Sequence, residues 1–136
     1  MQPVTSRRGA RRFLAILVAC CALAACENLR DPSVLVSQGA RVLDADEVRA
    51  RVAGNTELWS EGSVYYDPGG DLEMIWRKVK SKGQWTVSPE GTVCFEVPKW
   101  TETCHYYLEH ENRIITVSGA RVRGAFEVVP GKQLPR

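Results

Sequence analysis

Apolar and polar residues alternate along most of the chain after residue 57, in short runs separated by turn residues. Successive side chains of a β-strand point to opposite faces of a sheet, so a period of two predicts strands. The links between runs are short, whereas parallel neighbours would need long crossovers. The pattern predicts a mainly β domain, an antiparallel meander of about seven strands forming a small barrel or a strongly twisted sheet. The runs span residues 58–66, 71–79, 84–88, 92–97, 103–109, 113–118 and 122–129.

The separating residues predict the turns, and the apolar positions within the runs predict the core. Turns are expected at 67–70, 81–83, 89–91, 98–100, 110–112 and 119–120, where Gly, Pro, Asn or Asp occur. Burying one large apolar side chain stabilises a fold by about 1.5 to 3 kcal/mol. The side chains expected inside are Leu72, Met74, Trp76, Trp85, Val87, Val93, Phe95, Val97, Tyr106, Leu108, Ile115 and Val117.

One short N-terminal helix is expected ahead of the strands, over residues 44–53. Asp44 can accept hydrogen bonds from backbone N–H groups at the helix start, and Glu47 completes a capping-box pattern three residues later. A glycine and an asparagine directly after residue 53 provide the stop. Val48 and Val52 are four residues apart and share one face, so we expect that face to pack on the sheet.

Residues 1–25 have the three parts of a secretory signal peptide. Four arginines and no acidic residue precede an apolar run at 13–19, and mostly small residues follow at 22–25. The run is shorter than the roughly 20 residues of a membrane-spanning helix. The chain has 18 basic and 16 acidic residues, so loss of four arginines leaves 14 against 16. The remaining part is slightly acidic, which argues against a nucleic-acid partner.

The segment Leu23-Ala24-Ala25-Cys26 resembles a lipobox, in which the cysteine is acylated and becomes the first residue. The alternative is an ordinary alanine-rich cleavage site followed by a chance cysteine. Residues 26–40 show no long periodic pattern and are interpreted as the lipidated N-terminus and a tether, which leaves 41–132 for the β domain. We expect a protein of the cell envelope, bound to the membrane through Cys26 and facing the periplasm. Glu27, where aspartate would resemble an inner-membrane retention signal, favours the outer membrane.

Two cysteines, Cys94 and Cys104, remain in the mature domain once Cys20 and Cys21 leave with the signal and Cys26 carries the lipid. An even remainder in an oxidising compartment favours one disulfide. A metal site or a catalytic thiol is the alternative, but two cysteines without clustered histidines make a poor zinc site. The pair falls on consecutive runs, so a disulfide would fix the register of that hairpin.

Several short motifs together resemble an uncharacterised family of small exported proteobacterial proteins, domain of unknown function 995. The resemblance covers about residues 42 to 132 and rests on the order and spacing of its elements. It implies a small lipocalin-like architecture, and it carries over no catalytic residue. The matching elements are Val52-Ala53-Gly54-Asn55-Thr56, Tyr65-Tyr66-Asp67-Pro68-Gly69-Gly70, Gly83-Gln84-Trp85, Gly91-Thr92-Val93-Cys94, Trp100, Cys104 and Gly131.

The residues that most often carry catalysis are few. His105 and His110 are the two histidines, and a Cys–His nucleophile would need a free thiol. His105 points to the opposite face of its strand from Tyr106. Glu109, His110 and Glu111 could hold a metal only weakly, because successive side chains of an extended chain diverge. The sequence has no phosphate loop, nucleophile elbow or paired metal motif, so no catalytic residue, metal or cofactor is assigned.

Two surface features are candidate contacts for a ligand or partner. Arg77, Lys78, Lys80 and Lys82 gather positive charge around one hairpin, which suits anionic lipid head groups or acidic polysaccharide. The alternative is a solvated hairpin whose lysines prevent edge pairing. Trp100 lies in a polar turn beside the expected disulfide, where it could stack on a sugar or insert into a partner. Core packing is the alternative for this tryptophan.

These features favour a non-enzymatic envelope protein that binds a small apolar ligand or an envelope component, inside a barrel or near Trp100 and the basic hairpin. An inhibitor of a protease or lysozyme is the first alternative, and an enzyme is the second. A cavity of about 300 Å³ or more with an open mouth would favour ligand binding. A packed barrel with one rigid projecting loop would favour the inhibitor, and a perturbed titratable group in a cleft would favour the enzyme.

Overall fold

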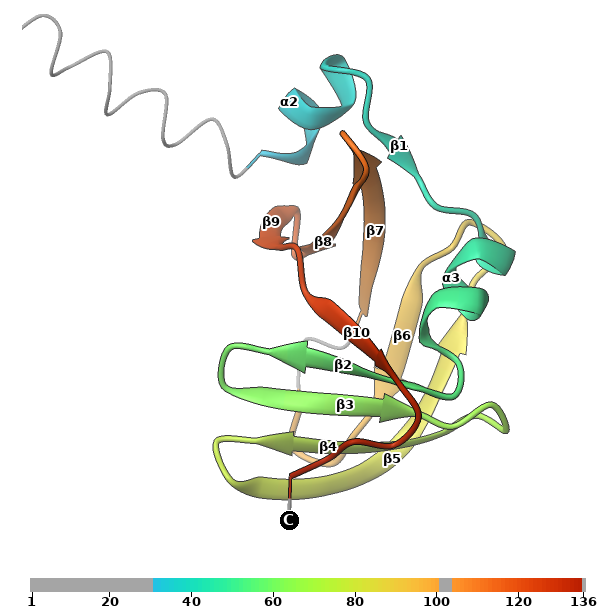
Figure 1. Cartoon of the computed structure of the whole chain (residues 1–136), viewed down its shortest axis with the longest axis vertical. Helices are drawn as coiled ribbons and strands as arrows, with labels where there is room; N and C mark the ends of the chain where they lie inside the picture. The colour runs from blue at the N-terminus through green and yellow to red at the C-terminus, as the bar shows by residue number, and fades with distance from the viewer. Residues whose placement is uncertain (1–30, 101–103, 136) are drawn as a thin grey trace, which may run out of the picture.

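The computed structural model describes residues 31–100 and 104–135, and most of these residues form antiparallel β-strands (Figure 1). The predicted signal peptide and Cys26 lie outside the described residues. In chain order the elements are α2 (Pro32–Ser37), β1 (Arg41–Val42), α3 (Ala45–Val52), β2 (Asn55–Trp59), β3 (Gly62–Tyr66), β4 (Asp71–Trp76), β5 (Val79–Val87), β6 (Val93–Glu96), β7 (Cys104–His110), β8 (Arg113–Ser118), β9 (Arg121–Gly124) and β10 (Glu127–Pro130).

The strands form one curled sheet in the order β10-β2-β3-β4-β5-β6-β7-β8-β9, and β1 pairs with β7 outside this path. From β2 to β9 each strand pairs antiparallel with the next along the chain, so the predicted antiparallel meander is confirmed. The last strand departs from it. β10 returns across the sheet to pair with β2, as Figure 1 shows, with Val129 opposite Thr56. The sheet is therefore a half-barrel whose two ends, β9 and β10, are joined by a short link.

The strand count is higher than predicted because two predicted runs are each divided in two and because β1 lies ahead of all the runs. The run 58–66 is two strands, β2 and β3, and the run 122–129 is divided into β9 and β10. The run 71–79 ends in a turn at Arg77 and Lys78, whose φ angles are 46° and 69°. Turns of this kind favour Gly, Asn or Asp, so the sequence carries no ordinary signal for it.

Gly83 was assigned to a predicted turn at 81–83, and this prediction is wrong. Residues 81–83 lie inside β5, which runs unbroken through the predicted turn. A Cβ atom at Gly83 would stand 1.9 Å from the carbonyl oxygen of Glu96 on β6. Glycine fits at this position because the two backbones approach closely. Close approach of backbones is a common reason for a glycine inside a strand.

The predicted helix is confirmed as α3, with the expected cap. The Asp44 carboxylate accepts hydrogen bonds from the backbone N–H groups of Asp46 and Glu47 at 3.0 and 2.9 Å. The Glu47 carboxylate accepts in return from the Asp44 N–H at 3.0 Å. Val48 and Val52 are fully buried against the sheet. No helix within residues 31–100 and 104–135 is long and apolar enough to span a membrane.

The end of the predicted tether is folded onto the sheet. Residues 32–37 form α2, and Leu35 and Ala40 are buried against Leu108 and Val117 on β7 and β8. The described part of 26–40 therefore packs on the sheet through Leu35 and Ala40. A helix of six residues is too short to show an apolar period, and only its tertiary contacts reveal it.

Two buried clusters lie on opposite faces of β7. The second one holds Leu108 and Val117, with Tyr106 and Ile115 packed against it, so these four do not face the main interior as predicted. In β7 it is Tyr107 that reaches the main cluster. That cluster is formed by Leu43, Val48, Val52, Val64, Tyr66, Leu72, Met74, Trp85, Val93, Phe95, Val97 and Tyr107.

The predicted disulfide is confirmed. Cys94 on β6 and Cys104 on β7 are bonded to each other and are direct partners in the strand register. The bond closes a loop with a sequence separation of 10. It fixes the pairing of β6 with β7 at a place where few other residue pairs join the two strands, Val93 with His105 being the neighbouring one.

Replacing Cys94 and Cys104 together by serine should lower the free energy of unfolding by about 3 kcal/mol, because the unfolded chain gains the freedom of the opened loop. Urea unfolding followed by tryptophan fluorescence measures this change. Wild-type protein treated with a reductant should unfold at the same urea concentration as the double variant. Equal stability of the oxidised wild type and the variant would contradict a stabilising role for the bond.

Candidate functional site

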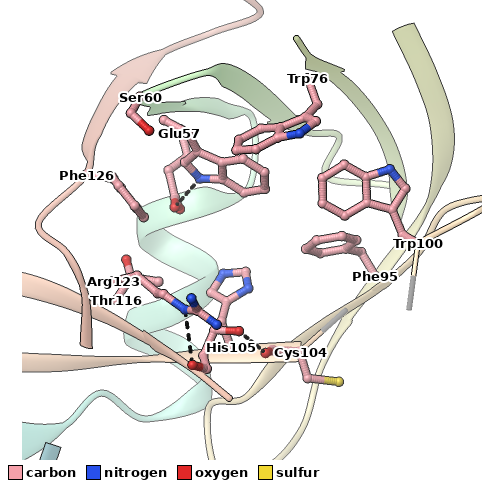
Figure 2. Close-up of a pocket in the computed structure, with 12 residues that line it drawn as sticks. Glu57, Ser60, Trp76, Phe95, Trp100, Cys104, His105, Thr116, Arg123 and Phe126 are labelled. Atoms are coloured by element: carbon pink, nitrogen blue, oxygen red, sulfur yellow. Dashed lines mark hydrogen bonds between the residues drawn. The ribbon is translucent and has the colours of Figure 1, made fainter. Parts of the chain in front are cut away.

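The concave side of the half-barrel holds a cavity of about 410 Å³. Its wall comes from β2, β4, β6, β7, β8 and β9 and from the segments beside them. Figure 2 shows Trp100 and Phe95 on one side, Glu57 and Phe126 on the other, and Trp76 and His105 between them. The polar lining residues are Glu57, Ser60, His105, Thr116, Ser118 and Arg123.

Strand register explains how the aromatic wall forms. Gly62 on β3 is the direct partner of both Trp59 on β2 and Trp76 on β4. Residues in one cross-strand row point to the same face of a sheet, which places the two indoles on one face. A Cβ atom at Gly62 would stand 2.1 Å from the carbonyl oxygen of Ile75, so the glycine allows β3 and β4 to approach closely here. The two rings meet edge to face with centroids 5.9 Å apart. The guanidinium of Arg77 lies 5.6 Å from the Trp76 centroid and covers that ring.

Trp100 is part of this wall, which decides between the two interpretations of the residue. It is half-buried and packs against the main core cluster. Its ring lies 5.8 Å from Trp76 and 6.4 Å from Phe95, both edge to face. Its side chain therefore contributes to the cavity instead of projecting from the turn.

A chain of buried hydrogen bonds forms the polar part of the wall. Glu57 is almost fully buried and accepts from the Trp59 indole N–H at 2.8 Å and from the Tyr107 hydroxyl at 2.5 Å. His105 Nε2 lies 2.9 Å from the same hydroxyl. The phenol has one proton, which it donates to Glu57, so His105 must donate through Nε2–H and keep a lone pair on Nδ1 when neutral.

Burial decides the protonation of this cluster. It lowers the pKa of His105 below its ordinary value, although the negative charge of Glu57 opposes the shift. Burial, together with the same carboxylate, raises the pKa of Tyr107 well above its ordinary value. The imidazole and the phenol are therefore both neutral near neutral pH, so the hydrogen-bond chain keeps one proton arrangement.

Two further polar groups surround this chain. The Thr116 hydroxyl is buried at the cavity wall without a hydrogen-bond partner among the described residues. Arg51 lies over the Tyr107 ring, 5.4 Å from its centroid, and donates to the backbone oxygen of Phe126 at 3.0 Å. The cavity thus has an apolar aromatic side and a polar side, and Thr116 Oγ1 is available on the polar one.

The basic hairpin is not part of this cavity, apart from the contact of Arg77 with Trp76. Arg77 forms an ion pair with Glu61 at 2.8 Å, and Lys82 lies 3.7 Å from Glu73. Lys78 and Lys80 line a separate groove on the outside of the sheet. Exposed pairs of this kind add little stability. The four predicted basic residues are near one another along the chain but do not converge on one site.

The sequence reasoning missed Glu57, His105, Tyr107 and Thr116 as a group. His105 and Thr116 stand on the faces of β7 and β8 that were expected to point outward, yet both are buried at the cavity. The strand pattern held one signal for this group. Glu57 and Trp59 share a face of their strand, and a carboxylate on a buried face is seldom without polar partners. Within the described ranges, no three His, Cys, Asp or Glu side chains gather as metal ligands.

The lowered pKa of His105 predicts how stability depends on pH. The unfolded chain binds a proton near the ordinary value of 6.5 and the folded protein only at lower pH, so stability falls as pH drops below about 6.5. In the window between the two pKa values, His105→Gln should flatten this dependence by up to about 1.4 kcal/mol per pH unit. Urea unfolding between about pH 5 and about pH 8 measures it. His110→Gln is the matched control, and an unchanged slope in His105→Gln would contradict the buried neutral imidazole.

The comparisons with known proteins agree with the resemblance found in the motifs. No curated protein and no solved structure matches the chain. A family model described as "Protein of unknown function (DUF995)" matches residues 15–111, which include α3, most of the cavity strands and both cysteines of the disulfide. The chain therefore belongs to the DUF995 family of proteins of unknown function.

Proposed function

We propose that this domain is a non-enzymatic binding protein that holds one small ligand with an apolar face inside the half-barrel. The cavity of about 410 Å³ carries the proposal. Its volume falls in the range of small-molecule sites, which bury a ligand among mostly apolar side chains with a few placed polar groups. Five aromatic residues and the Glu57 cluster match that description.

The same cavity bears on the two alternatives. An inhibitor of a hydrolase would present a rigid projecting loop, whereas the predicted loop residue Trp100 packs inward against Trp76 and Phe95. A catalytic role would draw on His105 and its lowered pKa. The His105 Nε2–H is held by Tyr107, which stands between the imidazole and Glu57, and Cys94 and Cys104 are bonded to each other. These hydrogen bonds and the disulfide engage the groups that catalysis would need, which favours binding over catalysis.

Binding in the cavity should be seen with the neutral fluorescent probe N-phenyl-1-naphthylamine, which brightens in apolar sites. Thr116→Phe places a ring inside the cavity and should weaken binding at least tenfold, because the probe and the new ring need the same space. Thr86→Phe, at an exposed position of β5, is the matched control and should bind like the wild type.

Trp100→Ala provides a second variant, since it removes part of the aromatic wall without filling the cavity. Its affinity for the probe should fall several-fold while the circular dichroism spectrum stays that of the wild type. Wild-type affinity in both Thr116→Phe and Trp100→Ala would show that the probe binds elsewhere and would remove the support for this proposal.

We further propose that the binding domain is held at an envelope membrane by a lipid on Cys26, with the outer membrane favoured by Glu27. The lipobox-like sequence supports this, and Cys26 stands only five residues before Asp31, where the described structure begins. A tether of that length keeps the cavity within a short distance of the bilayer.

Cys26→Ser should release the protein from the membrane fraction, because a single acylated residue supplies the anchor. Fractionation and intact mass measure the two parts of this prediction. Cys20→Ser, a cysteine inside the expected signal, is the control and should leave the acyl mass and the fractionation unchanged. Membrane retention of Cys26→Ser without any acyl mass would refute the anchor.

A further inference from the structure

Four aromatic rings of the cavity wall form a closed circuit. Around it the centroid distances are 5.9 Å from Trp59 to Trp76, 5.8 Å from Trp76 to Trp100, 6.4 Å from Trp100 to Phe95, and 6.4 Å from Phe95 back to Trp59. Three of these four contacts are edge to face. Successive rings are thus turned steeply to one another, as in the aromatic cages that surround methylated ammonium groups.

A buried carboxylate adjoins the circuit. Glu57 lines the same cavity and is tied to Trp59 through the indole N–H at 2.8 Å. Among the described residues Glu57 forms no ion pair, and the partners of its two oxygens, Trp59 and Tyr107, are both neutral. Arg51 offsets part of this charge from the Tyr107 ring. A buried charge without an ion partner is costly, so the site favours a cation on its cavity side.

We propose that the ligand of this cavity carries a quaternary ammonium group, which lies within the four rings beside Glu57. The inference rests on the proposed binding function and names its ligand class. A primary ammonium needs several hydrogen-bond acceptors, whereas each Glu57 oxygen already uses one of its two acceptor sites on Trp59 or Tyr107. A quaternary ammonium has no N–H to satisfy and is attracted by aromatic faces and by the carboxylate.

A further polar group fits the rest of such a ligand. The Thr116 hydroxyl, buried and without a partner among the described residues, can bond a hydroxyl or ester oxygen next to the ammonium. The arrangement matches a choline-like unit.

The test compares choline with 3,3-dimethylbutan-1-ol, in which a carbon replaces the charged nitrogen at nearly the same shape. Binding to the purified full chain is measured by isothermal titration calorimetry and by quenching of tryptophan fluorescence. Choline should bind at least tenfold more tightly than the neutral alcohol, a difference of about 1.4 kcal/mol. Equal affinities, or tighter binding of the alcohol, would overturn the inference and leave the proposed function standing.

Two variants locate the effect. Glu57→Gln should remove most of the preference for choline, while Glu73→Gln, a carboxylate of β4 outside the cavity, should keep it. If Glu57→Gln does not fold, Trp76→Leu should reduce the preference at least threefold, because it replaces a π face by an apolar side chain. A preference retained in the folded variant would contradict the cage. Binding of N-phenyl-1-naphthylamine without any binding of choline would overturn the ammonium site alone, and failure of all three compounds would overturn the binding function as well.

Discussion

The hydrogen bond from the Tyr107 hydroxyl to Glu57 holds the two halves of the half-barrel at a fixed separation. Its partners are 50 residues apart in the chain and stand on β2 and β7, which are not neighbours in the sheet. Both groups are buried, so breaking the bond would leave two polar groups without water, which costs far more than an exposed hydrogen bond. This polar contact thus joins two distant strands across the interior, beside the cavity that Glu57 lines.

The rest of the site depends on that separation. Tyr107 positions His105 through Nε2, and Glu57 positions Trp59 through its indole N–H. Trp59 then sets the first side of the aromatic circuit, and Gly62 lets β3 approach β4 closely where Trp76 meets it. The disulfide acts at the other side, where it pins β7 to β6. These contacts tie the polar and aromatic parts of the cavity wall to one another.

The sequence predicted the features that local chemistry decides. Alternation gave the antiparallel sheet, the Asp44 and Glu47 pair gave the helix cap, and the cysteine count gave the disulfide. The prediction of inward-facing residues from alternation was wrong where a strand is buried on both faces. In β7, Tyr107 faces the main cluster and Leu108 faces α2, so both sets of alternate positions include large buried side chains and the period cannot say which set points inward.

The remaining errors have separate physical causes. The turn at Arg77 and Lys78 uses residues that seldom adopt a positive φ, and Gly83 serves a close approach of strands in place of a turn. The return of β10 to β2 depends on contacts between residues that are about 70 positions apart, such as Val129 and Thr56. The candidate site depends on the same long-range pairing, since Glu57 meets His105 and Thr116 only after the sheet has curled. No local sequence pattern predicts contacts between residues so far apart in the chain.

The packing of α2 has a mechanical consequence for the strands beneath it. Leu35 presses on the outer face of β7 and β8, and the inner face of the same two strands carries His105 and Thr116. A pull on the chain ahead of Pro32 is delivered to these strands through Leu35 before it reaches the rest of the sheet. A force on the leading segment would thus act on the face of β7 and β8 opposite to the one that lines the cavity.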